Sequence, residues 1–363
     1  MIIKHLSLKN RTSGIIKNKI SDKCNIFVAD KIKKSRKAKS STFFSEKMKF
    51  SPDISFNYEL REVQARVFYK KQRLDLHRPL HPTILNKLLE DLRIEWTYNS
   101  NNIEGNTLTL AETKLVLQEG ITIGGKKLRE HFEVINHHKA ISYLEEIVRP
   151  GRMMETADML NLHEYILRNI IDEYAGRFRP GMVRIVGANF VPPNAQKVPS
   201  FLEDLISYIN ENTHGFDAVT LATLFHHRFV WIHPFIDGNG RTVRLAMNLI
   251  LMSHGYPPAF ILTQDRKKYF KALNDANNGD YDKLLLMMFQ AVERTLNIYL
   301  NSIGGDYEDF EPMESIARED EVPYSAEYLS LLARKGRIDA YKEGKVWLTT
   351  KSAIEAYRKN KLK

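Results

Sequence analysis

The sequence predicts a mainly α-helical fold: a helical bundle that carries a β-hairpin, followed by a small C-terminal domain. Three observations support this fold class. Residues 217–232 place apolar side chains at helical spacing, residues 241–253 are rich in good helix formers, and Thr109-Leu-Ala-Glu112 has the pattern of a capping box. With 363 residues, 43% of them hydrophobic, the chain can build one large domain and an appendage.

Residues 1–50 differ from the rest of the chain in charge. They hold 14 Lys and Arg against 3 Asp and Glu, so they account for the formal net charge of +10. The basic run at 31–39 has the composition of a nucleic-acid or membrane-surface arm. We favour a disordered leader, because Met48 would begin the folded region cleanly.

The composition indicates a cytoplasmic protein without a membrane span. Cys24 is the single cysteine, which excludes an internal disulfide framework and suits a reducing compartment. The chain has no run of about 18 apolar residues, the length that a membrane helix requires. Its N-terminus also lacks the apolar segment of a secretory signal.

Residues 97–105 are expected to form the end of a helix. Ser100 and Glu104 lie four residues apart, so they share one helix face. Gly105 is the residue type that ends a helix in a left-handed conformation. The capping box at 109–112 then begins the next helix.

Residues 184–191 are expected to form a β-hairpin. The apolar residues on either side of Gly187-Ala188, among them Ile185 and Val186, fit two short strands around a turn. Pro192-Pro193 would close the second strand, because proline cannot donate to a ladder. An ordinary surface hairpin has the same pattern.

A helix over 217–232 is expected to deliver His233 at its end. The imidazole of His233 can accept a proton near neutral pH. The Gly-Asn-Gly turn that follows sits at the start of the helix over 241–253. Unpaired N–H groups and the helix dipole favour anions at such a position.

The residues around this turn are suited to polyphosphate. Gly238 and Gly240 lack a Cβ, which permits close approach of a phosphate. Arg241 and Arg244 share a helix face and can clamp phosphate oxygens. Asp237 supplies a hard oxygen ligand for Mg²⁺.

The segment His233-Pro-Phe-Ile-Asp-Gly-Asn-Gly-Arg-Thr-Val-Arg244 resembles the Fic family pattern His-x-Phe-x-[Asp/Glu]-Gly-Asn-Gly-Arg-x-x-Arg at every defined position. The resemblance implies adenylylation: a Ser, Thr or Tyr hydroxyl of a target protein attacks the α-phosphate of ATP, and pyrophosphate leaves. The resemblance implies that His233 acts as the base, that Phe235 packs inward and that Asp237 binds Mg²⁺. It implies that Asn239 and the loop N–H groups contact the α-phosphate. Arg241 would contact the β-phosphate, and Arg244 the γ-phosphate.

A second segment, Ser100-Asn-Asn-Ile-Glu104-Gly105, resembles the inhibitory motif [Ser/Thr]-x-x-x-Glu-[Gly/Asn] that precedes the core in one class of Fic proteins. The resemblance implies that Glu104 pairs with Arg244 and takes away the cation that would hold the γ-phosphate. ATP would then bind unproductively, and the enzyme would be restrained by default.

The resemblance extends to two less specific segments. The hairpin over 184–191 looks like the family's flap, whose free strand edge at Ile185, Val186, Gly187 and Ala188 would dock an extended segment of the target. Tyr269 and Asn277 match a family segment near the adenine pocket. Packing of Tyr269 in the core explains that residue equally well.

Residues 304–323 are acidic and lack an apolar period, which predicts a linker. Residues 324–363 resemble the winged helix-turn-helix domains of excisionase-like and MerR-like DNA binders, with a helix at 325–333, a turn and second element at 336–341, a hairpin at Gly344 and a last helix after Thr350. DNA contact and protein docking are both compatible with this domain. DNA contact implies that the following residues face phosphates: Lys335, Arg337, Lys342 and Lys345.

Protein adenylylation by a Fic domain spanning 51–303, with ATP and Mg²⁺, is the main functional prediction. One alternative is removal of AMP from a modified protein, in which Glu104 aligns a water. Another is a DNA-binding regulator whose nucleotide site only senses ATP. Self-modification and a homodimer fit the same sequence, and the loop is compatible with UTP, GTP or CDP-choline.

Overall fold

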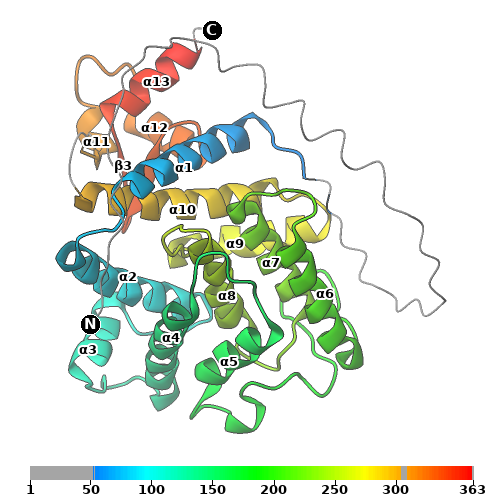
Figure 1. The fold of residues 1–363 in the computed structure, drawn as a ribbon. Helices are drawn as coiled ribbons and strands as arrows, with labels where there is room; N and C mark the ends of the chain where they lie inside the picture. The colour runs from blue at the N-terminus through cyan, green and yellow to red at the C-terminus, as the bar shows by residue number, and fades with distance from the viewer. Residues whose placement is uncertain (1–51, 53, 304–308, 362–363) are drawn as a thin grey trace, which may run out of the picture. The chain divides into compact units, whose positions relative to one another are not determined.

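The protein is described by a computed structural model over residues 52, 54–303 and 309–361. The expected basic leader over 1–50 and residues 304–308 of the expected linker lie outside these described residues. The predicted mainly α fold is confirmed (Figure 1).

The bundle is built from ten α-helices and three short 3₁₀ helices within residues 54–303. The α-helices are α1 Tyr58–Leu76, α2 Pro82–Ile103, α3 Leu110–Glu119, α4 Leu128–Ile147, α5 Thr156–Leu167, α6 Val198–Glu211, α7 Ala218–Ile232, α8 Asn239–Ser253, α9 Arg266–Asn277 and α10 Asp282–Ile303. The 3₁₀ helices are η1 Asp172–Tyr174, η2 Ala195–Lys197 and η3 Thr263–Asp265. Across the part of the chain that the structure covers, no helix combines the length and apolar character needed to cross a membrane.

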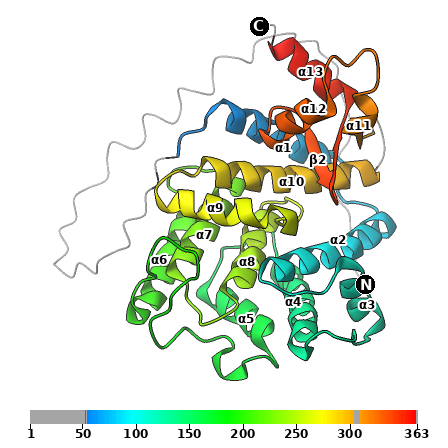
Figure 2. The ribbon, with the colours of Figure 1, turned by 180° about the vertical axis from the view of Figure 1, so that it is seen from behind.

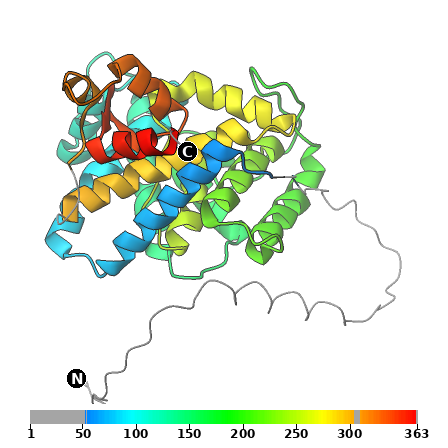
Figure 3. The ribbon, with the colours of Figure 1, turned by 90° about the horizontal axis from the view of Figure 1, so that it is seen from above.

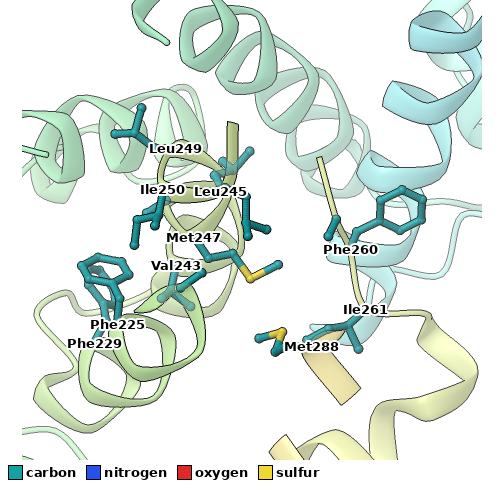
Figure 4. Packing of buried hydrophobic residues seen from close by; sticks show 14 of the residues in the cluster. Phe225, Phe229, Val243, Leu245, Met247, Leu249, Ile250, Phe260, Ile261 and Met288 are labelled. Carbon is teal, nitrogen blue, oxygen red and sulfur yellow. The ribbon is translucent and has the colours of Figure 1, made fainter. Parts of the chain in front are cut away.

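Helix α8 lies at the centre of the bundle. It contacts α2, α4, α5 and α7, and the two opposite views place these helices around it (Figures 1 and 2). Thirteen of its 15 residues are buried, so it is a core helix rather than an amphipathic surface helix. Phe225 and Phe229 of α7 and Val243 and Met247 of α8 belong to the hydrophobic cluster at this centre (Figure 4).

Helices α7 and α3 begin at the positions that their capping residues predict. The side chain of Asp217 caps α7 by accepting from the N–H groups of Val219 and Thr220. The capping box of α3 is present, with Thr109 and Glu112 bonding each other's backbone N–H. Local capping chemistry therefore sets these helix starts, as the sequence predicts.

A C-terminal subdomain, defined as residues 309–361, contains a small sheet and three helices: β1 Glu311–Pro312, α11 Met313–Ile316, α12 Ala326–Arg334, β2 Ala340–Glu343, β3 Val346–Thr349 and α13 Lys351–Lys361. The sheet is antiparallel, in the order β1-β3-β2, and Ala340 pairs with Thr349 in its register. The predicted helix, hairpin and last helix are present. Its classification as a winged helix stays a prediction.

The predicted acidic linker is wrong for residues 309–323. Met313 and Ile316 are buried, with 2% and 0% of their surface exposed, in a core shared with Leu329. Their spacing of three places both on one face of α11, while β1 pairs with β3. Ala317 and Val322 pack against the same core, so the apolar residues of this segment hold it to the subdomain.

Ion pairs join α1 to α10, which run side by side (Figure 3), and α1 to the C-terminal subdomain. The Glu293 carboxylate of α10 accepts from Arg66 Nε at 2.8 Å and Lys70 Nζ at 2.9 Å. Lys70 also pairs with Asp339 Oδ1 at 2.5 Å. Because Glu293 and Lys70 are almost fully buried, each charge needs its partner.

We expect Gly336→Ala to destabilise the chain at this junction. Gly336 has a φ of +71°, and a Cβ there would lie 2.5 Å from Val63 Cγ2 and 2.9 Å from Leu286 Cδ1. Backbone strain and overpacking should together lower the free energy of unfolding by about 2–4 kcal/mol, measured by urea denaturation. Gly344→Ala is the matched control, since its φ of +56° gives strain with no neighbour within 4 Å. Equal losses in both variants would contradict the tight docking.

Candidate active site

The turn between α7 and α8 is made by two residues with left-handed backbone conformations. His233 ends α7 with a φ of +51°, and its N–H donates to the Phe229 carbonyl at 2.9 Å. Gly238 begins α8 with a φ of +75°. The predicted glycine turn therefore lies at a helix N-terminus, where backbone N–H groups favour an anion.

Asn239 and Phe235 close the turn on itself. Asn239 Oδ1 accepts from the Phe235 N–H at 2.9 Å, and Asn239 Nδ2 donates to the Phe235 carbonyl at 2.8 Å. The Phe235 ring is fully buried and stacks on His163 with 3.6 Å between centroids. Phe235 packs inward as expected. Both polar ends of the Asn239 side chain are bonded inside the turn, but its amide nitrogen carries a second N–H, so the expected contact with the α-phosphate stays a prediction.

His163 supports the turn from α5, a role the sequence did not suggest. Its Nδ1 accepts from the Gly176 N–H at 3.1 Å, so Nε2 carries the proton and donates to the Asp237 carbonyl at 3.0 Å. Burial lowers the pKa of His163 to about 4. The ring is therefore neutral, as this pair of hydrogen bonds requires.

Arg179 was also missed, because the two arginines between Gly176 and Gly181 follow no pattern that indicates a role. It is 2% exposed and ties both ends of the 181–193 loop to the turn. Its guanidinium donates to the carbonyl of His233 at 2.8 Å, to that of Gly181 at 2.7 Å, and to that of Pro193. Its own N–H donates to the Pro234 carbonyl at 2.9 Å.

The hydrogen bonding of His233 leaves one ring nitrogen suited to act as a base. Nδ1 lies 3.3 Å from the Val230 carbonyl, which can only accept, so Nδ1 carries the proton. Nε2 then holds the free lone pair. Burial lowers the pKa of His233 to about 4, so the imidazole is neutral at physiological pH.

Asp237 presents an ionised carboxylate beside His233. It accepts from the Gly238 N–H at 2.6 Å and pairs with Arg129 Nη2 at 2.5 Å. Burial alone would raise the pKa of Asp237, but Arg241, the Gly238 N–H and Arg129 outweigh it and lower this pKa. Among the described residues no three metal-binding side chains cluster. A single carboxylate that shares a cation with phosphate oxygens is nevertheless typical of Mg²⁺ sites, so Asp237 fits that ion.

Glu104 contacts Arg244, as the resemblance to the inhibitory motif implies. Glu104 lies just past the end of α2, and Gly105 follows with a φ of +102°. Its Oε1 is 2.8 Å from Arg244 Nη2. Arg244 also donates from Nε to Ser100 Oγ at 3.1 Å and from Nη2 to the Ser100 carbonyl at 2.8 Å. The end of α2 is thus fixed on α8 by one guanidinium.

The other ionic groups of the turn also have partners inside the chain. Arg241 Nη1 is 3.3 Å from Glu133 Oε1, and the same Glu133 oxygen accepts from Arg129 Nε at 3.1 Å. Arg129 reaches Asp237, as described above. Both α4 residues were missed, because an Arg and a Glu four apart on a helix are usually a solvated pair.

The predicted strands over 184–191 are absent, although all eight residues are described and a turn lies where expected. The Ala188 N–H donates to the Ile185 carbonyl at 3.2 Å, and Gly187 has a φ of +81°. The loop bonds to α9: Asn274 Nδ2 donates to the Gly187 carbonyl at 3.1 Å, and Asn189 Nδ2 donates to the Asn274 carbonyl at 3.5 Å. Val186 is fully exposed at the tip.

Tyr269 and Asn277 hold α9 in place. Tyr269 is buried, lies 3.0 Å from His226 Nε2 through its hydroxyl and contacts Arg244, so the core-packing explanation applies. Asn277 Oδ1 accepts from His227 Nε2 at 2.8 Å, while its Nδ2 donates to Asn189 at 3.1 Å. Asn277 therefore links the 184–191 loop to α7.

We expect the free energy of unfolding to fall as the pH drops from about 7 to about 5. Burial holds the pKa of several histidines below the value of about 6.5 in the unfolded chain, so the unfolded state binds more protons in this window. Each such histidine contributes a slope of up to about 1.4 kcal/mol per pH unit. The histidines are His163, His227 and His233, each at about 4, with His137 and His226 also lowered.

Urea denaturation at pH 5, 6, 7 and 8 measures this dependence. Stability should be nearly flat between pH 7 and 8. The lowered pKa values of the Asp237 and Glu293 carboxyls make those groups matter only below about pH 4.5, outside the window. Equal free energies of unfolding at pH 5 and pH 7 would show that burial does not keep these histidines neutral.

Comparison with known proteins gives one family. A family model described as the Fic/DOC family matches residues 154–251. The chain is similar to "Protein adenylyltransferase Fic" of Nematostella vectensis, with 34% identity over 247 residues, covering 67% of this chain and 56% of that protein. It thus spans about half the length of the curated relatives it matches.

Solved structures agree with this match. The structure titled Fic-1, residues 134–508, from Caenorhabditis elegans is 31% identical with a TM-score of 0.59, covering 67% of this chain and 71% of that chain. A Fic domain containing signaling protein from Bacteroides thetaiotaomicron is 25% identical with a TM-score of 0.59, covering 68% of this chain and 99% of that chain.

Proposed function

Because the chain belongs to the Fic/DOC family, we propose that it is a protein adenylyltransferase, which transfers AMP from ATP to a Ser, Thr or Tyr hydroxyl of a target protein. The observation that carries the proposal is the position of His233, whose free Nε2 lies at the end of α7 beside the N-terminus of α8. Relatives from Nematostella vectensis and Caenorhabditis elegans bear the name protein adenylyltransferase, which supports the same activity.

The proposed reaction uses the turn for positioning and proton transfer. The acceptor hydroxyl oxygen bonds to the α-phosphorus of ATP, and the bond from that phosphorus to the bridging oxygen breaks. Pyrophosphate leaves with the electron pair, and the hydroxyl proton passes to Nε2 of His233. The N–H groups at the start of α8 stabilise charge on the α-phosphate, and Arg241 and Arg244 bind the outer phosphates.

Asp237 is the residue that would hold a Mg²⁺ ion. The ion would neutralise negative charge on the phosphates of ATP. Arg129 pairs with the same carboxylate at 2.5 Å, so a cation bound there would compete with this guanidinium for Asp237.

Glu104 is proposed to restrain this activity. Its carboxylate is bonded to Arg244, so the γ-phosphate and Glu104 compete for one cation. Gly240 leaves the space that Glu104 fills, since a Cβ at residue 240 would lie 2.1 Å from Glu104 Oε1. ATP would therefore bind in a pose that is poorly aligned for attack.

We expect Glu104→Gly to raise the transfer of labelled AMP from ATP at least about tenfold, which corresponds to about 1.4 kcal/mol. His233→Ala should abolish transfer in both the parent and the Glu104→Gly background. The assay is mass spectrometry of the chain and of added protein after incubation with ATP and Mg²⁺. His214→Ala is the matched control, because His214 is exposed and lies away from the turn.

Two results would contradict the proposal. Transfer of AMP by His233→Ala at the parent rate would show that His233 is not the base. A Glu104→Gly variant no more active than the parent would show that Glu104 does not restrain the enzyme, but it would not contradict the transferase activity.

Removal of AMP from a modified protein is the second candidate function. It is favoured by one observation, since the Glu104 carboxylate lies close enough to act electrostatically on His233 and can orient a water there. Incubation of the purified chain with a pre-modified target separates the two activities. Loss of AMP from the target that requires both Glu104 and His233 would support the removal activity.

A target protein with an acceptor hydroxyl is the proposed partner, in the cytoplasm, and self-modification and a homodimer belong to the same proposal. DNA has less support from the expected cations. Arg337 pairs with Glu59 at 2.7 Å, and Lys342 lies over the Trp347 ring at 5.3 Å. Two of the four cations expected to face DNA phosphates thus have partners inside the chain. The other two, Lys335 and Lys345, are exposed.

A further inference from the structure

We infer that a cavity between α9, α10 and the β2–β3 hairpin binds a small carboxylate that carries an aromatic or branched apolar group. The cavity has a volume of about 280 Å³. It lies outside the catalytic turn, because none of its lining residues belongs to 233–244. This site is independent of the proposed transferase activity.

The anchor for the carboxylate is Arg294, which is 6% exposed and lines the cavity. Its Nε donates to the Lys342 carbonyl at 3.1 Å, and its Nη2 pairs with Glu95 at 2.5 Å. Its Nη1 is buried and has no hydrogen-bond partner among the described residues. A buried donor of a charged group that lacks an acceptor is unfavourable, so a ligand oxygen at Nη1 would be strongly stabilised.

The walls of the cavity supply apolar and aromatic surface. The Arg294 guanidinium lies 4.8 Å from the centroid of the Phe260 ring. The partly exposed side chains that complete the walls are those of Leu286, Met287 and Trp347. An apolar group attached to the carboxylate would cover these side chains and remove them from water.

The charge around the cavity favours an anion. Asp265 is the one acidic residue among the described residues that line it, and it pairs with Lys268 at 2.8 Å. Burial lowers the pKa of the Lys342 ammonium, which a nearby anion would offset. The basic residues of the lining outnumber the acidic one: Lys268, Lys271, Lys283, Arg294, Arg334 and Lys342.

The size and the single unpaired donor select the class of ligand. The volume is just below the range of about 300–1,000 Å³ usual for small-molecule sites, so a folded protein or a helix does not fit. A polyphosphate needs many free donors, but three lysines of the lining already pair inside the chain: Lys268 with Asp265, and Lys271 and Lys283 with Asp275. Arg294 Nη1 is the buried donor of the lining that has no partner among the described residues. A monoanionic acid with an apolar body matches both properties. Such a group occurs in free acids and at the C-terminus of a peptide.

Isothermal titration of the full chain tests the site with three probes: 3-phenylpropionate, 4-methylpentanoate and a tetrapeptide ending in phenylalanine. Their amides, which lack the charge, are the matched ligands. At least one carboxylate should bind at least about tenfold more tightly than its amide, as expected for a hydrogen bond to a charged group. Binding of the peptide that is lost on amidation identifies a chain terminus as the source.

The protein variants are chosen so that folding and binding can be separated. Met287→Glu places a negative charge on the partly exposed wall and should weaken carboxylate binding at least about tenfold, whereas Arg294→Lys keeps the buried charge and should weaken it less. Lys359→Gln, at the exposed end of α13, should bind as the parent does. The proposal is overturned if no carboxylate binds, if the amides bind equally well, or if Met287→Glu binds like the parent.

Discussion

The structure depends on the need of two buried arginines for partners. Arg241 and Arg244 are 2% and 1% exposed on a helix that is otherwise core. Breaking a buried ion pair typically destabilises a protein by about 3–5 kcal/mol, so these two cations constrain whatever packs around α8. Glu104 and Ser100 bring in the end of α2, and Glu133 brings in α4. The same pairing that completes the fold therefore occupies the groups that would bind phosphate.

The turn before α8 is rigid for a different reason. Several of its polar groups bond inside the turn or to a buried side chain: Asn239 bonds to the Phe235 backbone, and the His233 carbonyl accepts from Arg179. A turn fixed in this way holds its N–H groups and the His233 ring in one arrangement before any ligand arrives. The proposed chemistry needs little else from the protein, because transfer at phosphorus is governed by positioning and charge.

Much of this arrangement was accessible from the sequence. Apolar spacing and capping residues predicted α7 and the start of α3, and the turn motif predicted the order of the active-site residues. The contact between Glu104 and Arg244 was expected only from the resemblance to a motif, since 140 residues separate the two and no periodicity connects them. A local pattern determines a helix, while a contact of this kind depends on the packing of whole helices.

The failures have the same physical origin. The 184–191 loop has apolar residues around a glycine, but its backbone partners are side chains of α9, which local sequence does not reveal. The acidic composition of 309–323 predicted a linker, although Met313 and Ile316 are buried there. Their burial depends on packing against α12, which the composition does not indicate. Arg129, Glu133, His163 and Arg179 act through distant partners, so nothing next to them in the sequence indicated their roles.

The space beside Gly240 has a consequence for the position of the Glu104 carboxylate. A Cβ on residue 240 would lie 2.1 Å from Glu104 Oε1, so a methyl group there would overlap the carboxylate. That oxygen is the far end of a flexible side chain, so a larger residue at 240 would displace the carboxylate and leave the backbone of α2 in place. A change at residue 240 alone should therefore alter the restraint before it alters the fold.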